Sequence, residues 1–92
     1  MTVRWTPISL RDLSALHSYI AQDNPAAATA VVEAFLKGIA VLLSNPHLDR
    51  AGRVAGTGEL VLVPYMIAYR SRKSAIEILG IIHGARRWPD FF

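Results

Sequence analysis

The sequence contains no cysteine, which excludes disulfide bonds and thiolate metal sites and fits the reducing cytosol. A secretory signal is also missing, because the first nine residues, MTVRWTPIS, contain no apolar h-region. The longest apolar segment, residues 26–43, is interrupted by Glu33 and Lys37 and is therefore a poor membrane span. We expect a cytoplasmic protein with no membrane partner.

Two further kinds of motif are absent. No glycine motif of the P-loop or dinucleotide-binding type occurs in the sequence. His17 lies in a predicted helix and His47 in a predicted loop, and neither has a carboxylate at metal-ligand spacing. The sequence therefore predicts no metal site and no cofactor.

The composition is that of one small globular domain covering residues 1–92. Hydrophobic residues make up 52% of the chain and charged residues 18%, and no segment is of low complexity. A chain of this length buries only a modest core, so a bound partner could add noticeably to its stability.

The net charge of +3 is unevenly distributed along the chain. Residues 1–44 carry three cations and three anions, whereas residues 45–92 carry seven cations and four anions, so the whole excess lies in the second half. Six of those seven cations are arginine, which favours bidentate contacts with phosphate or carboxylate groups. The charge indicates a nucleic acid or an acidic protein as partner, and an ordinary solvated basic surface is the alternative.

Two helices are predicted in the first half, after a short strand at about residues 3–6. Thr6 followed by proline is a helix-start signal, and apolar residues at helical spacing extend this helix over about 8–22. Asn24 followed by proline repeats the signal, and the second helix runs over 25–44. Because the link between them is only two or three residues long, the helices must form an antiparallel hairpin.

Three strands are predicted in the second half, after a loop at residues 47–58. The strands cover residues 59–63, residues 65–70 and an apolar run that begins at Ala75. The order β-α-α-β-β-β predicts a two-layer α+β domain, in which an antiparallel helical hairpin packs on a mostly antiparallel sheet.

The last predicted strand ends in the residues best suited to catalysis or ligand recognition. Its apolar run, AIEILGII, suits a strand in the middle of a sheet, buried on both faces. Strict alternation divides its side chains into two faces, with Ile76, Ile78, Gly80 and Ile82 on one and Glu77, Leu79, Ile81 and His83 on the other. His83 and the arginines that follow it would then form a recognition or catalytic edge.

Several short motifs occur in order along the chain: Trp5-Thr6-Pro7, Asp23-Asn24-Pro25, Asn45-Pro46, Glu59-Leu60-Val61, Tyr65-x-Ile67-x-Tyr69-Arg70 and a terminal HGARRWP that begins at His83. As an ordered set, they make almost the whole chain resemble the RelE/ParE superfamily of small bacterial toxins. The resemblance implies the RelE/ParE-like fold and growth inhibition as the toxin of a type II toxin–antitoxin module. It also implies a cognate antitoxin that has a ribbon-helix-helix DNA-binding part and a segment that wraps the toxin.

The superfamily divides by target. The RelE-like branch cuts messenger RNA on the ribosome, whereas the ParE-like branch poisons DNA gyrase and is not known as a nuclease. In the nuclease branch, as we align it, an arginine directly follows the first tyrosine of the middle strand, and a tyrosine or histidine acts near the carboxy terminus. Here Met66 occupies the arginine position and no tyrosine follows Tyr69.

These departures favour a ParE-like inhibitor of DNA gyrase. A RelE-like, ribosome-dependent mRNA endoribonuclease is the alternative. A third reading is a protein that has lost its toxicity and serves mainly as an antitoxin partner or corepressor.

Five side chains are candidates for contacts with the target or the antitoxin: Arg53, Arg70, His83, Arg86 and Arg87. If the protein is a nuclease, the catalytic candidates are His83, Arg86, Arg53 and Arg70. Histidine exchanges protons near neutral pH, and arginine can hold a phosphate.

Each of these residues also has a structural interpretation. His83 could bond to backbone or contact the antitoxin, and Arg70 could form an ion pair with Glu59 or Glu77. Tyr65 and Tyr69 share a strand face, and packing is the favoured role for both over stacking on bases.

Overall fold

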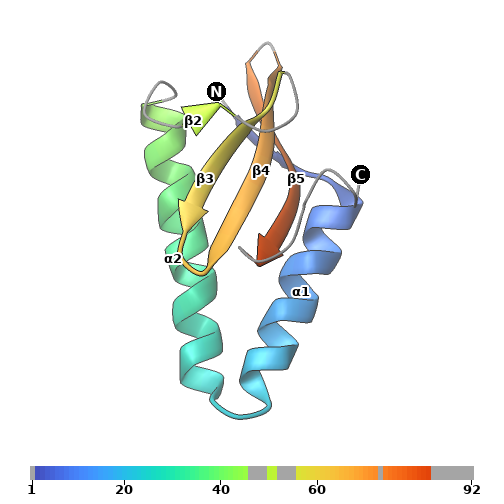
Figure 1. The fold of residues 1–92 in the computed structure, drawn as a ribbon, viewed down its shortest axis with the longest axis vertical. Helices are drawn as coiled ribbons and strands as arrows, with labels where there is room; N and C mark the ends of the chain where they lie inside the picture. The colour runs from blue at the N-terminus through green and yellow to red at the C-terminus, as the bar shows by residue number, and fades with distance from the viewer. Residues whose placement is uncertain (1, 46–49, 52–55, 73, 84–92) are drawn as a thin grey trace.

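The computed structural model describes residues 2–45, 50–51, 56–72 and 74–83. Two helices pack on one sheet, as Figure 1 shows. The elements in chain order are β1 (Thr2–Trp5), α1 (Pro7–Ala21), α2 (Pro25–Ser44), β2 (Arg50–Ala51), β3 (Gly58–Leu62), β4 (Tyr65–Arg72) and β5 (Ala75–His83). The predicted α+β fold is confirmed. The short strand β2 was not predicted and lies within the segment expected to be a loop.

The sheet has the strand order β1-β5-β4-β3-β2. β1 runs parallel to β5, and the other neighbouring pairs are antiparallel. The predicted interior position of β5 is therefore correct, although β4 is the strand in the middle. The parallel β1–β5 pair brings the amino-terminal strand alongside the first half of β5, from Ala75 to Ile78.

The helix-start signals that the sequence predicts are formed. The Thr6 hydroxyl accepts a hydrogen bond from the Ser9 amide at 3.2 Å, and Asn24 Oδ1 accepts one from the Ala27 amide at 3.0 Å. Thr6 also joins α1 to the sheet, because its hydroxyl donates to the Ile78 carbonyl at 2.8 Å. The cap therefore specifies both where α1 begins and where it lies on β5.

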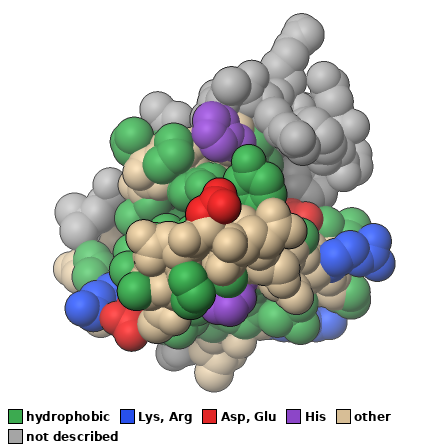
Figure 2. All heavy atoms as spheres, turned by 90° about the horizontal axis from the view of Figure 1, so that it is seen from below, with side chains coloured by type: hydrophobic (Ala, Val, Ile, Leu, Met, Phe, Trp, Pro, Cys, Tyr) green, Lys and Arg blue, Asp and Glu red, His purple; other side chains and the backbone are tan. Residues whose placement is uncertain are grey.

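The surface at the helical-hairpin end of the molecule is mainly hydrophobic and neutral (Figure 2). Lys and Arg side chains lie at the sides of this face, and histidine and acidic side chains lie nearer its centre. The described Lys and Arg side chains are therefore not concentrated in the middle of this face.

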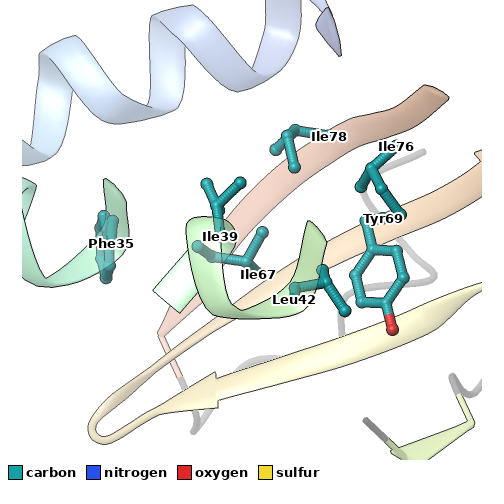
Figure 3. Close-up of a cluster of buried hydrophobic side chains, with 7 residues drawn as sticks. All are labelled: Phe35, Ile39, Leu42, Ile67, Tyr69, Ile76 and Ile78. Carbon is teal, nitrogen blue, oxygen red and sulfur yellow. The ribbon is translucent and has the colours of Figure 1, made fainter. Parts of the chain in front are cut away.

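The core lies between the helices and one face of the sheet, as Figure 3 shows. Its buried side chains come from α2, β4 and β5: Phe35, Ile39, Leu42, Ile67, Tyr69, Ile76 and Ile78. Leu13 and Leu16 of α1 pack against this cluster. The core role of Tyr69 matches the packing interpretation made from the sequence.

The helix α2 is apolar enough to meet a length-and-composition test for a membrane span, with a mean hydropathy of 1.9. Core helices pass the same test, and Phe35, Ile39 and Leu42 of α2 are buried against the sheet. Gly38 lies within this helix although glycine costs about 1 kcal/mol relative to alanine there. A Cβ atom at Gly38 would lie 3.3 Å from methyl groups of Leu60 and of Leu62, so close packing on β3 accounts for the glycine.

A β-bulge in β5 overturns the predicted alternation of its side chains. Ala68 pairs with Gly80 but Tyr69 pairs with Ile78, so Leu79 has no residue opposite it on β4. Beyond the bulge the two faces exchange, and Ile81 packs with the helix-side core. The prediction that Ile81 and His83 share a face with Glu77 is therefore wrong, because one extra residue reverses every later side chain.

Candidate functional site

The end of β5 forms an aromatic row with β4 and α2. His83 lies opposite Tyr65 in the strand register, and their ring centroids are 5.7 Å apart in an edge-to-face arrangement. Tyr65 in turn meets the buried ring of Phe35 edge-to-face at 5.8 Å. The row Phe35–Tyr65–His83 thus connects the core to the exposed histidine, and it exists because the bulge turns His83 towards the helices.

Asp12 of α1 holds the last part of β5. The Ile81 amide donates a hydrogen bond to Asp12 Oδ2 at 3.1 Å. β1 pairs with β5 only as far as Ile78, so this carboxylate takes the place of a strand partner beyond that point. Asp12 was not predicted as a functional residue, and its only signal in the sequence is a carboxylate directly before Leu13 on the apolar face of the helix.

We expect Asp12→Ala to lower the free energy of unfolding by about 1–2 kcal/mol, because it leaves the Ile81 amide without its charged acceptor. Asp12→Asn retains an acceptor oxygen and should cost less. Chemical denaturation measures the stability, and hydrogen exchange should show faster exchange of the Ile81 amide. The matched control is Asp23→Ala in the exposed turn between the helices, and equal losses for both alanine variants would contradict this role.

Arg70 lies at the opposite end of the β4–β5 pair from His83. Its Nη2 is 3.5 Å from Glu77 Oε1, which is one of the ion pairs expected from the sequence. Arg70 pairs with Glu77 in the register whereas Tyr65 pairs with His83, so five residues of β4, or roughly 17 Å, separate the two positions.

The two candidates also lie on different faces of the sheet. His83 is on the helix side with Tyr65, whereas Arg70 alternates with the core residue Tyr69 and is on the other side. The structure therefore does not bring Arg70 and His83 together.

The remaining candidates Arg53, Arg86 and Arg87 lie outside the described residues, as does His47. Met66 is 3% exposed and packs with Ala68 and Ile82 on the sheet face away from the helices. Within the described residues, no group of three or more histidine or carboxylate side chains could hold a metal ion.

The chain is thus a two-helix hairpin on a mixed sheet, with a basic second half and a histidine at the end of the last described strand. Comparison with known proteins places this arrangement in the RelE/ParE superfamily of toxins. Residues 3–88 match the ParE toxin of type II toxin–antitoxin systems, parDE, and the chain belongs to this family.

Two relatives match nearly the whole chain. A Sinorhizobium fredii protein, Y4kP, that carries a toxin designation is 39% identical over 90 residues, which cover 96% of this chain and 93% of the relative. Toxin RelE2 of Caulobacter vibrioides is 35% identical over 85 residues, which cover 91% and 96%. One relative is therefore named for the RelE branch, and the name of the other states no branch.

Two solved structures are similar in fold. A chain from the chromosomal ParDE toxin–antitoxin system of P. aeruginosa has a TM-score of 0.77 and 26% identity, covering 90% of this chain and 95% of that chain. A chain from the RelBE2 toxin–antitoxin complex of Mycobacterium tuberculosis has a TM-score of 0.62 and 30% identity, covering 89% and 95%. Both come from toxin–antitoxin systems, which supports a cognate antitoxin as a partner of this chain.

Proposed function

We propose that this type II toxin acts in the ParE-like manner, by binding and inhibiting DNA gyrase, and that a cognate antitoxin holds it inactive. The family match over residues 3–88 supports the ParE-like branch. We further propose that the antitoxin carries a ribbon-helix-helix DNA-binding part.

The separation of Arg70 from His83 supports binding over RNA cleavage, because it removes Arg70 from a nuclease site built around His83. Cleavage through the 2′-hydroxyl needs a proton-transfer group and a cation at the same phosphate. The described histidine and arginine candidates lie on opposite faces and roughly 17 Å apart along the strands, so they cannot share one phosphate. A binding toxin has no such requirement.

The test is expression of the chain with and without its antitoxin. Expression alone should stop growth, co-expression should restore it, and the purified protein should inhibit gyrase supercoiling in a dose-dependent way. Unchanged supercoiling at excess toxin, together with cuts at codon positions in ribosome-bound messages, would overturn the proposal. Absence of growth arrest would instead indicate a partner or corepressor without toxicity.

Ribosome-dependent mRNA cleavage is the second candidate function, and the 35% identity to Toxin RelE2 is the observation that favours it. In that case His83→Ala should lower the cleavage rate on the order of 10²-fold, the usual contribution of one acid–base group. If His83→Ala abolishes toxicity while the wild type cuts no message, His83 is a contact residue and the nuclease function is excluded.

A further inference from the structure

We infer that Arg4, Arg70 and Arg72 form an anion-binding surface, the arginine face, that takes an extended acidic segment of a partner protein. The arginine face lies on the side of the sheet away from the helices, at the end opposite His83. Its ligand has carboxylates at alternate positions of a strand-like chain. The antitoxin is the source of this segment, so this part of the inference rests on the proposed function.

The strand register places the three arginines together. Glu77 of β5 lies opposite Arg4 on β1 and opposite Arg70 on β4, so the three residues form one row across adjacent strands. The neighbours of Arg4 along β1, Val3 and Trp5, pack into the helix-side core, which places Arg4 on the other face.

Arg72 follows Arg70 on the same side of β4. It pairs with Ala75 at the start of β5 and is exposed. Alternation along β4 places Arg70 and Arg72 on one face, while Tyr69 between them points into the helix-side core. The bulge lies on β5, so it does not disturb this alternation.

The charges of the arginine face are not balanced within the described residues. Glu77 is 16% exposed in its side chain and is paired with Arg70, which is 39% exposed. Arg4 and Arg72 are exposed and make no ion pair in the part of the chain that the structure describes. Glu59 of β3 lies opposite Ala68 on the same face and is buried. Three arginines with Glu59 and Glu77 give a local charge of +1, from three cations minus two anions, and the excess lies on the exposed Arg4 and Arg72.

Arg70 adds hydrogen-bond donors to this surface. Its Nε is buried and has no hydrogen-bond partner among the described residues. This buried nitrogen is closed to a ligand from solvent, so an incoming acceptor would use the remaining N–H donors of the Arg70 side chain, which is 39% exposed as a whole. A carboxylate that accepts from arginine in the bidentate manner supplies two acceptor oxygens.

The spacing of the arginines favours an extended peptide. Residues two apart on a strand are separated by about 6.6 Å, so Arg70 and Arg72 match alternate side chains of a second extended chain. Arg4 lies two strands away from β4, at about 9.6 Å, and can contact the same segment from its other side.

A single-stranded nucleic acid fits this face less well. Proteins that bind single strands combine cations with aromatic side chains on which the bases stack. The described side chains on this face beyond the charged row are Glu59, Val61, Met66, Ala68, Leu79 and Ile82, and none is aromatic. Trp5, Tyr65 and Tyr69 all pack on the helix side.

The test measures binding of labelled peptides by fluorescence anisotropy. The first peptide has eight residues with glutamate at every second position and serine between. The second has the same composition with its four glutamates in succession. The wild type should bind the alternating peptide more tightly, and the affinity should fall as salt is raised.

Two variants remove exposed cations without disturbing the Arg70–Glu77 pair. Arg4→Gln and Arg72→Gln should each weaken binding of the alternating peptide roughly three- to tenfold. The matched controls, Arg11→Gln on α1 and Lys37→Gln on α2, remove exposed cations from the helices and should change binding less than about twofold. Thermal unfolding checks that all four variants fold.

Three outcomes would overturn the inference. Equal losses in the sheet and helix variants would indicate a diffuse charge effect, and equal binding of both peptides would exclude a strand-spaced site. An eight-nucleotide single-stranded DNA that binds more tightly than the peptide, and that loses affinity in the same two variants, would assign the face to nucleic acid.

The source of the segment is tested separately from the proposed function. Antitoxin affinity is measured on the wild type and on Arg4→Gln and Arg72→Gln, and unchanged affinity would exclude the antitoxin as the ligand of this face. Growth arrest and gyrase inhibition report on the proposed function in independent assays. Peptide binding without toxicity would therefore support the arginine face as a binding site for an acidic segment while rejecting the gyrase proposal.

Discussion

Replacing Gly58 with alanine should lower the free energy of unfolding by about 3 kcal/mol, the upper range for overpacking a core. Gly58 pairs with Tyr69 across β3 and β4, and a Cβ atom at this position would overlap the Tyr69 ring, with Cε2 at 2.8 Å. Tyr69 is 6% exposed and belongs to the core cluster, so a shift of its ring would disturb the packing of its neighbours. Thermal unfolding should show a fall in Tm of more than roughly 10 °C for a domain of this size.

The control for this substitution is Gly38→Ala. The new methyl group there meets only the flexible ends of Leu60 and Leu62 at 3.3 Å, and the gain in helix propensity of about 1 kcal/mol opposes the crowding. We expect a net change within about 1 kcal/mol. Adding Tyr69→Leu to Gly58→Ala should make the two effects strongly non-additive, and simple additivity would contradict the overlap.

Replacing Phe35 with alanine should cost about 3–5 kcal/mol, since the side chain is 1% exposed and its removal leaves a cavity between α2 and the sheet. The same change removes the ring against which Tyr65 packs, and Tyr65 packs against His83. We therefore expect a lower unfolding free energy in denaturant and a shifted His83 ring resonance in NMR spectra.

The neighbouring residue is the matched control for Phe35. Leu36 is 51% exposed, and Leu36→Ala should cost less than about 1 kcal/mol and leave the His83 resonance in place. A His83 resonance that is unchanged in a folded Phe35→Ala variant would show that the aromatic row does not position the histidine.

Local signals in the sequence predicted the elements of this fold well. A hydroxyl or amide before proline marked both helix starts, and the observed caps at Thr6 and Asn24 use those side chains. The two helices and the three later strands begin and end within about two residues of the prediction. The helix caps depend on hydrogen bonds between neighbouring residues, and the strands were recognised from local runs of strand-forming side chains, which is why both could be predicted without the rest of the chain.

The faces of β5 were predicted only in part. Ile76 and Ile78 form the core as alternation required, but Ile81 and Ile82 are both strand-forming apolar residues that suit either face. Nothing in the local sequence marks Leu79 as the residue to be left unpaired. The bulge is set by the pairing of β5 with β4, which the alternation pattern does not contain.

The sequence by itself determined the two helix starts, the apolar strands and the basic second half, because each depends on side chains that are close together in the chain. Only the tertiary structure decided that the His83 ring lies against Tyr65 and that Asp12 accepts a hydrogen bond from the Ile81 amide. It also decided that Arg4 and Arg70 lie in one row, on either side of Glu77. Asp12 and Ile81 are 69 residues apart in the sequence. Such contacts depend on strand register and helix placement, which arise from packing the whole chain.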